Sequence, residues 1–328
     1  MVQNRTDWGQ FEALLEAAHG KRSRLQTATD TNAYRLVNGA GDDLEGLTVD
    51  RFAETLVVSL YNTDLEPQLL ESIAKVFAPQ SIYLKRRPKE ARVVASTHRS
   101  ELAPLGAVWG LQTPEVAILE AGRRFLIRPG GDLSVGLFLD MRQTRNWLQQ
   151  NIGSGSLLNC FAYTCGFGVA AALGGAGRVV NLDLSKKVLQ WGQENYHLNS
   201  LEPHSIDFIS GDSFEWFERF ARRSDRFSAI ILDPPSFATS RHSRFSAVSN
   251  YDQLVAQAVR LLEPGGLLLA CCNHSKLSRL HFKKAIARGL EGSRRGYNLL
   301  KSLGQSNTDF PVLPTAEAPL KVFALEVL

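Results

Sequence analysis

The 328-residue sequence lacks the marks of a membrane or exported protein. It has no apolar run close to the ~20 residues that a membrane-spanning helix needs. The N-terminus, MVQNRTDWGQFEALLEA, resembles neither a signal peptide nor a basic transit helix. We therefore expect a cytoplasmic protein with no membrane partner. Internal repeats and low-complexity segments are also absent from the sequence, which excludes a repeat architecture.

Cysteine is scarce, and the four residues are Cys160, Cys165, Cys271 and Cys272. Their spacing fits no zinc-binding template, and a chain of this size and setting is not expected to depend on disulfides. We therefore expect free thiols, buried in apolar strands for Cys160 and Cys271, and no metal site.

Neither sign of charge is in large excess, since 37 Lys and Arg residues face 33 Asp and Glu residues. The net charge of +4 allows a polyanionic partner without requiring one. A hydrophobic fraction of 44% is typical of a globular protein, and the length suits two domains. We predict a helix and linker over 1–32, a small α/β domain over 33–130 and a larger α/β domain over 131–328.

The larger domain is organised around residues 156–183, SLLNCFAYTCGFGVAAALGGAGRVVNLD. The pattern predicts a buried strand to Phe161, a loop, a helix of small apolar residues and a second strand that ends at Asp183. In doubly wound sheets a nucleotide lies across the carboxyl ends of such strands, with its ribose hydroxyls on the acid. The alternative is an ordinary crossover with an exposed aspartate.

The loop of this unit lacks the G-x-G-x-x-G fingerprint that brings backbone amides close to a pyrophosphate. Only Gly166 and Gly168 are present in A-Y-T-C-G-F-G. This argues against an NAD-linked oxidoreductase and favours a nucleoside without phosphates, for which S-adenosylmethionine (SAM) is suitable.

Further strands predict a mostly parallel, Rossmann-like sheet of seven strands with an antiparallel hairpin at its C-terminal edge. Beyond the first two, we expect strands at 206–209, 227–232, 267–272, 297–303 and 320–327. Acidic residues follow consecutive strands at Asp183, Asp212 and Asp233. One such acid alone is usually a loop cap, but three at neighbouring strand ends favour ligand binding.

The segment D-P-P-S-F, residues 233–237, is the most specific local motif. Its two prolines fix the backbone and donate no N–H, so the strand-end carbonyls become rigid acceptors. Phe237 could stack on an extruded base, or it could fill the core of a rigid turn. The segment G-L-F-L-D-M-R-Q-T-R, residues 136–145, is also unusual, although Asp140 could cap a helix while Arg142 and Arg145 stay solvated.

These motifs resemble those of bacterial large-subunit ribosomal RNA methyltransferases. They are, in order, G-L-F-L-D-x-R-x-T-R, N-C-F-A-Y-T-x-G-F, D-L-S, G-D-S-F, D-P-P-S-F and G-G-L-L-L. The resemblance covers nearly the whole chain from about residue 33. Two branches look closest, namely the cytosine-5 enzymes that carry an N-terminal PUA domain and the guanine-N7 half of a bifunctional enzyme. The resemblance implies a SAM-dependent RNA methyltransferase.

The resemblance also implies roles for individual residues. The methionine part of SAM would lie against Asp140, Arg142, Phe161, Tyr163, Thr164 and Gly166. Asp183 would take the ribose, and Asp212 with Ser213 the adenine side. The substrate base would be held by Asp233, Pro234, Phe237 and Asn273.

The chain departs from the family first in its RNA-binding part, since residues 1–32 are too few for a PUA domain. We therefore expect RNA to be positioned by the small domain and by basic residues. The candidates are Lys85 to Arg92, Arg241, Arg244, Lys276, Arg279, Lys283 and Lys284, each of which could instead be a solvated surface charge. A homodimer is compatible with the sequence.

The second departure concerns the mechanism. Cytosine-5 transfer needs a cysteine thiolate that adds to C6 of the base. Asn273 stands where the relatives place that cysteine, and Cys272 lies one residue early, on the opposite face of the strand. We therefore favour direct transfer to a nucleophilic base atom, as in the guanine-N7 branch. Cytosine-5 transfer by Cys272 stays open if the strand bulges there, and so does a non-catalytic RNA-binding protein with a vestigial SAM fold.

Overall fold

The computed structural model describes residues 7–61, 67–88, 96–235, 237–239, 244–246 and 249–328, with the backbone alone at 237–239 and 244–246. The chain forms two compact units, one of Met1–Leu139 with Ser306–Ala316 and one of Asp140–Gln305 with Glu317–Leu328. The three-part division at 32/33 and 130/131 stays a prediction, because compactness does not test which segments fold independently.

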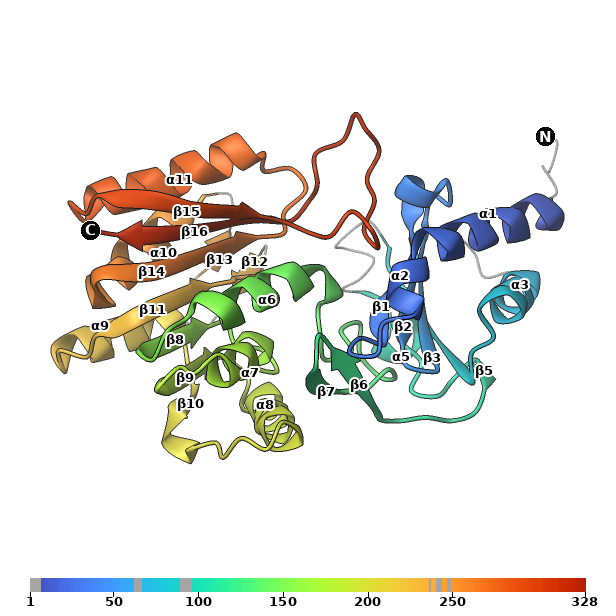
Figure 1. Cartoon of the computed structure of the whole chain (residues 1–328), viewed down its shortest axis with the longest axis horizontal. Helices are drawn as coiled ribbons and strands as arrows, with labels where there is room; N and C mark the ends of the chain where they lie inside the picture. Colours follow the sequence, from blue (N-terminus) through green and yellow to red (C-terminus); the bar gives the residue numbers. More distant parts are fainter. Residues whose placement is uncertain (1–6, 62–66, 89–95, 236, 240–243, 247–248) are drawn as a thin grey trace. The chain divides into compact units, whose positions relative to one another are not determined.

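The first unit is built on a five-stranded sheet in the order β1-β2-β3-β4-β5 (Figure 1). The strands are β1 Ala33–Asn38, β2 Leu47–Phe52, β3 Thr55–Leu60, β4 Ser81–Arg86 and β5 Trp109–Gly110. Strands β3 and β4 are parallel, because the chain returns through helix α3, Pro67–Phe77. Helix α1, Trp8–Lys21, shares with α3 and the sheet a core that includes Leu15, Leu36 and Ile73.

Shorter elements complete the first unit. They are α2 Ser23–Gln26, η1 Gly39–Asp42, α5 Arg99–Leu102, β6 Val116–Glu120 and β7 Arg123–Ile127. Strands β6 and β7 form an antiparallel hairpin whose turn residues, Ala121 and Gly122, have φ angles of 47° and 79°. Both angles are left-handed, as a two-residue hairpin turn requires.

Residues 306–316 belong to the first unit although the strands on either side belong to the second. The buried Arg22 donates to both carboxylate oxygens of Asp42, at 2.7 and 2.6 Å, and to the carbonyl of Asp309 at 3.0 Å. Asn38 donates to the carbonyl of Pro311 at 2.7 Å. Burial alone would raise the pKa of Asp42, but the hydrogen bonds from Arg22 and its neighbours outweigh burial and lower it.

The second unit contains a seven-stranded sheet in the order β10-β9-β8-β11-β14-β16-β15. Its strands are β8 Ser156–Cys160, β9 Arg178–Asp183, β10 Phe208–Ser210, β11 Phe227–Leu232, β14 Leu262–Cys272, β15 Tyr297–Leu303 and β16 Lys321–Val327. Strands β10, β9, β8, β11 and β14 are parallel, and β16 is antiparallel to both of its neighbours. The predicted Rossmann-like sheet with its antiparallel C-terminal hairpin is confirmed.

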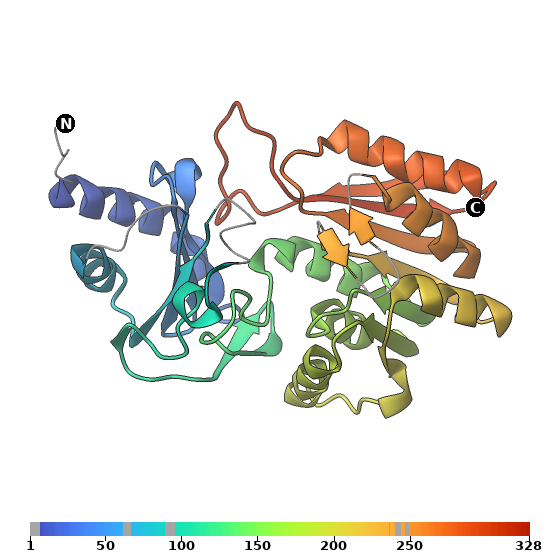
Figure 2. The same cartoon turned by 180° about the vertical axis from the view of Figure 1, so that it is seen from behind.

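Helices cover both faces of this sheet (Figures 1 and 2). They are α6 Arg142–Asn151, α7 Gly166–Leu173, α8 Lys186–Leu198, α9 Ser213–Arg222, α10 Tyr251–Ala258 and α11 Arg279–Gly292. One core cluster joins the sheet to α6 and α7 and includes Leu148 and Ala171. Another cluster joins the sheet to α9, α10 and α11 and includes Phe217, Leu254 and Phe282.

The remaining elements are short and lie in the connections. They are η2 Leu139–Met141, η3 Ser205–Asp207, η4 Val259–Leu261 and the paired β12 Phe237–Thr239 and β13 Arg244–Ser246. The strand expected at 206–209 begins two residues late, because η3 occupies its start and Asp207 accepts from Arg178. In the described part of the chain, no helix has the length and apolar character to cross a membrane.

Replacing Arg22 by methionine should lower the free energy of unfolding by about 3 kcal/mol, because it leaves the buried Asp42 carboxylate without its main charged partner. Urea denaturation followed by circular dichroism measures the change. Arg24→Met is the control, since this neighbouring arginine is exposed, and its effect should stay within about 0.5 kcal/mol. Equal losses in the two variants would contradict a special role for the buried pair.

Candidate active site

The loop after β8 contains three non-glycine residues with left-handed backbone angles. Phe161, Tyr163 and Cys165 have φ angles of 58°, 49° and 61°, in the left-handed region that non-glycine residues rarely adopt. Each such residue costs roughly 1–3 kcal/mol and persists only where its surroundings enforce it. Three of them within five residues therefore point to a loop shaped for function.

Asp183 holds this loop from the tip of β9. Its carboxylate accepts from the Tyr163 N–H at 2.9 Å and from the Ser185 N–H at 2.9 Å. Burial raises the pKa of Asp183, and these backbone donors partly oppose the rise. A carboxylate offers about four acceptor positions, so Asp183 has capacity left for further donors.

A buried polar network supports the loop from below, and sequence reasoning missed it. Asn159 of β8 donates to Asn181 of β9 at 2.9 Å, and Asn181 donates to the Tyr196 hydroxyl at 3.1 Å. Asn195 of α8 donates to the carbonyl of Thr164 at 2.9 Å. Asparagines within apolar strands were the available signal, because buried amides must find partners.

Several predicted cofactor residues present backbone rather than side chain at this loop. Thr164 is buried, and the Phe161 ring packs against the apolar core. Gly166 begins helix α7. The Tyr163 ring is half-buried, with its centroid 6.3 Å from that of Trp191.

Asp212 follows β10, which pairs with β9 on the side opposite β8. Its carboxylate caps helix α9. One of its carboxylate oxygens accepts from the N–H groups of Phe214 at 2.9 Å and Glu215 at 3.4 Å, and the adjacent Ser213 is buried. Leu184, next to Asp183, leaves 50% of its side chain exposed beside these acids. An exposed leucine at a strand tip offers apolar contact to a flat ring, and sequence reasoning missed this feature.

A second group of predicted residues gathers at the ends of β11 and β14. The Asn273 amide donates to the Asp140 carboxylate at 2.7 Å. Burial, followed by the charge of Asp140, raises the pKa of Asp233 to about 7, and Arg145 opposes the rise. Arg142 and Arg145 are 7% and 2% exposed, so the alternative that both are solvated is wrong.

The sheet register brings the two groups to one edge. Cys160 pairs with Leu182 and with Leu232, and Leu232 also pairs with Ala270. The residues that follow these partners, among them Phe161, Asp183 and Asp233, therefore leave the sheet side by side. Carboxyl ends of parallel strands at a reversal of strand order, here between β8 and β11, are where such folds bind ligands.

The D-P-P-S-F motif is only partly described. Pro234 is buried and Pro235 is exposed. Phe237 begins β12, but its side chain lies outside the described residues, as do Arg241 and the side chain of Arg244. Stacking of Phe237 on a base therefore stays a prediction.

All four cysteines are free and buried, as predicted for Cys160 and Cys271. Cys271 packs in the core beneath α6 and α7, whereas Cys272 packs in the core beneath α10 and α11. Burial raises the pKa of both thiols. Strand β14 pairs with β16 without a register shift from Gly266 to Cys272, so no bulge turns Cys272 toward the opposite face.

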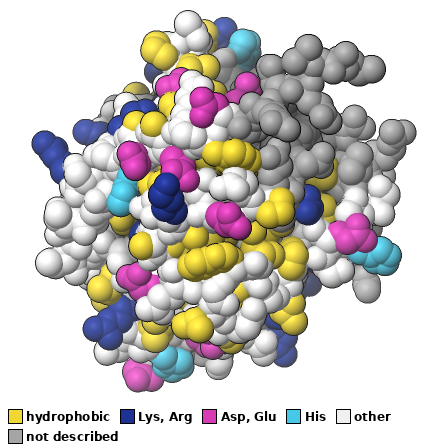
Figure 3. Space-filling model, turned by 90° about the vertical axis from the view of Figure 1, so that its right-hand side faces the viewer, with side chains coloured by type: hydrophobic (Ala, Val, Ile, Leu, Met, Phe, Trp, Pro, Cys, Tyr) yellow, Lys and Arg dark blue, Asp and Glu magenta, His cyan; other side chains and the backbone are white. Residues whose placement is uncertain are grey.

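The predicted basic residues differ in their availability. Lys85 is 0% exposed and donates to the Asp132 carbonyl, so the expectation that it contacts RNA is wrong. Arg279 donates hydrogen bonds to the Ser302 hydroxyl and to the Leu303 carbonyl. Lys276, Lys283 and Lys284 are exposed. On the face shown in Figure 3, basic and acidic side chains are interspersed rather than gathered by sign.

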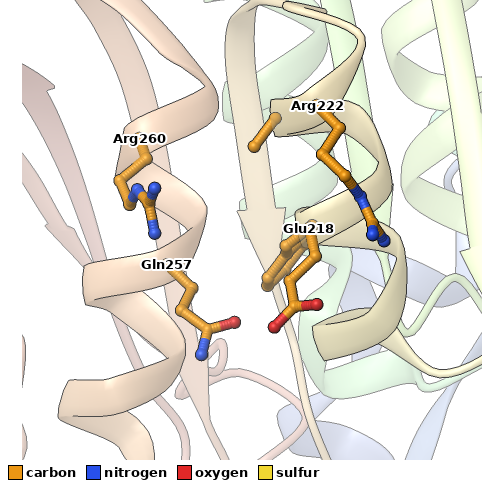
Figure 4. A pocket seen from close by; sticks show the side chains of 6 residues that line it. Glu218, Arg222, Gln257 and Arg260 are labelled. Atoms are coloured by element: carbon orange, nitrogen blue, oxygen red, sulfur yellow. The ribbon is translucent and has the colours of Figure 1, made fainter.

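A cavity of about 420 Å³ lies between helix α9 and the consecutive elements α10 and η4, and none of its lining residues is a predicted site residue. It is lined by Phe217, Glu218, Ala221, Arg222, Gln257 and Arg260. Figure 4 shows Glu218 and Gln257 extending toward each other from the two helices. In the part of the chain that the structure describes, no three His, Cys, Asp or Glu side chains could together hold a metal ion.

Gly192→Ala should weaken SAM binding about tenfold or more, because its Cβ would lie 2.3 Å from the Cys165 sulfur and displace the strained loop. Isothermal titration calorimetry with SAM measures the change. Gly20→Ala is the matched control, since no atom lies within 4 Å of its Cβ position. Unchanged SAM affinity in Gly192→Ala would show that the loop does not form the cofactor site.

Comparisons with known proteins identify the family. The sequence model described as S-adenosylmethionine-dependent methyltransferase matches residues 34–295. Ribosomal RNA large subunit methyltransferase I of Klebsiella pneumoniae (strain 342) is 29% identical over 323 residues, 97% of this chain and 80% of that protein. The protein of that name in Salmonella newport (strain SL254) is 31% identical over 322 residues, 97% of this chain and 79% of that protein.

Solved structures agree with the sequence comparison. The crystal structure of SMU.776 complexed with SAH has a TM-score of 0.89 at 27% identity and covers 99% of this chain and 83% of that chain. A SAM-dependent methyltransferase from Agrobacterium tumefaciens, with a TM-score of 0.65 at 19% identity over 91% of this chain and 90% of that chain, shows the shared fold alone. The chain therefore belongs to the S-adenosylmethionine-dependent methyltransferase family, as its motifs predict, and is an enzyme that uses SAM as its cofactor.

Proposed function

We propose that this enzyme methylates a base of large-subunit ribosomal RNA by direct transfer, without a cysteine nucleophile, in the manner expected for guanine N7. The names of its curated relatives support the substrate. The observation that carries the mechanism is the hydrogen bond from Asn273 to Asp140, at the strand end where a cytosine-5 enzyme would need its cysteine.

The hydrogen-bond acceptors of the site suit the polar groups of SAM. Asp140, Asp183 and Asp212 place acceptors at one sheet edge, which suits the ammonium, ribose hydroxyl and adenine amino groups of SAM and disfavours phosphates. In this proposal Asp183 binds the ribose and Asp212 with Ser213 lies on the adenine side. Asp140, Arg142 and the backbone of Phe161 to Gly166 hold the methionine part. When bound, SAM supplies a methyl group on a positively charged sulfur.

Direct transfer requires no covalent bond between the protein and the base. Guanine N7 already carries a lone pair, so the residues need to orient the base and exclude water. Asp233, with a carboxylate beside the rigid Pro234, would accept hydrogen bonds from the base edge. Phe237 would stack on the base, and Asn273 would fix Asp140 next to it. The buried Cys272, with its raised pKa, is poorly suited to supply a thiolate.

RNA binding is assigned to surfaces outside this edge. We propose that the exposed lysines Lys276, Lys283 and Lys284 contact phosphates near the site. The small domain, at 33–130 in the predicted division, would position the RNA beside the methyltransferase domain at 131–328. Cytoplasmic location follows from a ribosomal RNA substrate, and a homodimer is compatible with the proposal.

Nucleoside mass spectrometry tests the function. The purified enzyme, SAM and large-subunit rRNA from cells that lack the protein should yield 7-methylguanosine, with free rRNA and assembled subunits tried in parallel. Asp183→Ala, which should lose SAM binding, is the control. Formation of 5-methylcytidine would instead support the second candidate, cytosine-5 transfer by Cys272. SAM binding without any methylated nucleoside would support a non-catalytic RNA-binding protein.

The two residues at the end of β14 separate the mechanisms. Cys272→Ser should keep methyl transfer within about threefold, whereas Asn273→Ala should lower kcat about a hundredfold through misplacement of Asp140. Single-turnover transfer of labelled methyl groups measures both. A stable covalent adduct with RNA that contains 5-fluorocytosine, lost in Cys272→Ser, would overturn direct transfer.

Asp233 should give the reaction a pH dependence. With a pKa of about 7, it becomes a charged acceptor as the pH rises, so kcat should increase from about pH 6 to pH 8. Asp233→Asn should be slower and should lack this rise. A wild-type profile that is flat across this range would contradict the assigned role of Asp233.

Asp233 should also make the stability of the folded protein depend on pH, in the opposite direction to kcat. Because its folded pKa lies above the unfolded value, the folded state binds more protons, and stability should fall as the pH rises from about 4 to 7. Asp233→Asn should therefore be more stable than the wild type near pH 8 in urea denaturation. The exposed Asp43→Asn, as control, should not change the trend.

A further inference from the structure

Strands β11 and β14 separate where the reaction is proposed to occur. Their last paired residues are Leu232 and Ala270. Asp233 follows directly in one chain segment, and Cys271, Cys272 and Asn273 follow in the other. Beyond the last pair, the ladder of hydrogen bonds between these two strands no longer fixes the distance between Asp233 and Asn273.

The Tyr251 hydroxyl spans this separation. It lies 3.0 Å from the carbonyl oxygen of Leu232 and 3.0 Å from the carbonyl oxygen of Cys271. Leu232 is the last residue of β11, and Cys271 is the first residue of β14 beyond its last pair with β11. A single O–H shared by two backbone acceptors therefore ties the two segments together where the strand ladder stops.

The tyrosine ring is rigidly held. Tyr251 is 1% exposed, and its ring makes an edge contact with Phe282 of α11 at a centroid distance of 4.7 Å. Helix α10, which Tyr251 begins, packs closely on α11 at Gly289, where an added Cβ would lie 2.5 Å from the carbonyl oxygen of Asp252. Burial raises the pKa of the Tyr251 hydroxyl well above its ordinary value, so the group stays a donor.

The two segments carry groups that depend on one another. Asn273 donates to Asp140, and the charge of Asp140 contributes to the raised pKa of Asp233. The electrostatic coupling of Asp140 and Asp233 therefore changes with the distance between the segments, because Coulomb interactions in a poorly solvated site vary steeply with distance.

We propose that the Tyr251 hydroxyl is a positioning group that holds the ends of β11 and β14 at the separation that methyl transfer requires. The proposal deepens the function proposed above, because it takes Asp233 and Asn273 as the groups that flank the substrate base. Tyr251 does not touch the base or SAM in this scheme. It acts through the backbone of Leu232 and Cys271.

Tyr251→Phe removes the hydroxyl and keeps the ring on Phe282. It should lower kcat about tenfold or more while the Kd for SAM stays within about twofold. The rise of kcat with pH should move to lower pH, because the separated segments weaken the repulsion between Asp140 and Asp233. Leu254→Ala is the control, since it truncates a buried side chain of the same helix and keeps the Tyr251 hydroxyl.

Amide hydrogen exchange provides a readout that does not depend on catalysis. Exchange over residues 271–275 should speed up about tenfold in Tyr251→Phe but not in Leu254→Ala of similar melting temperature. If Tyr251→Phe fails to fold, Phe282→Leu, which loosens the ring and keeps the hydroxyl, should show the same changes to a smaller degree.

Two results would overturn the proposal. One is a Tyr251→Phe enzyme with wild-type kcat and pH profile. The other is a loss of kcat and exchange protection no larger than that of Leu254→Ala. Absence of methyl transfer in the wild type would instead contradict the proposed substrate, and the exchange measurement would still decide the role of Tyr251.

Discussion

The hydrogen bond from the Tyr163 N–H to the Asp183 carboxylate is the constraint on which the proposed cofactor site depends. It holds the loop after β8 in a shape that includes left-handed φ angles at Phe161, Tyr163 and Cys165. Such a backbone is unfavourable by itself and needs surroundings that enforce it. The support comes from the amide network of Asn159 and Asn181 below the loop and from Asn195 beside it.

The site concentrates negative charge where the strands end. Asp140 and Asp233 stand close enough that one raises the pKa of the other, and Arg145 only partly compensates. Placing two carboxylates this close together is unfavourable by itself, because like charges repel each other. Its persistence is understandable if the acids receive donors from a positively charged cofactor and from a base. The repulsion between the two acids is then the cost of a preorganised set of acceptors for these donors.

The sequence predictions that were wrong or left open share one cause. The sequence does not show which side chains are exposed to solvent. Lys85 belongs to a basic run, yet it lies inside the first unit with its ammonium group on a backbone carbonyl. Arg145 could be solvated or buried on the same pattern, and it is buried. Ile206 resembles the start of a strand, but it belongs to a short turn and is 76% exposed. Periodicity indicates the type of element and not its surroundings.

The sequence alone determined the order of strands and helices in the larger domain and the family, because apolar periodicity and closely spaced motifs are local properties of the chain. It also determined which acids follow which strands. Only the tertiary structure decided which of these residues are neighbours, because the pairing of β8 with β11 joins residues about 70 positions apart, such as Leu157 and Ala229. The contacts of Asn273 with Asp140 and of Tyr251 with two strand ends arise from that pairing, and no local pattern encodes them.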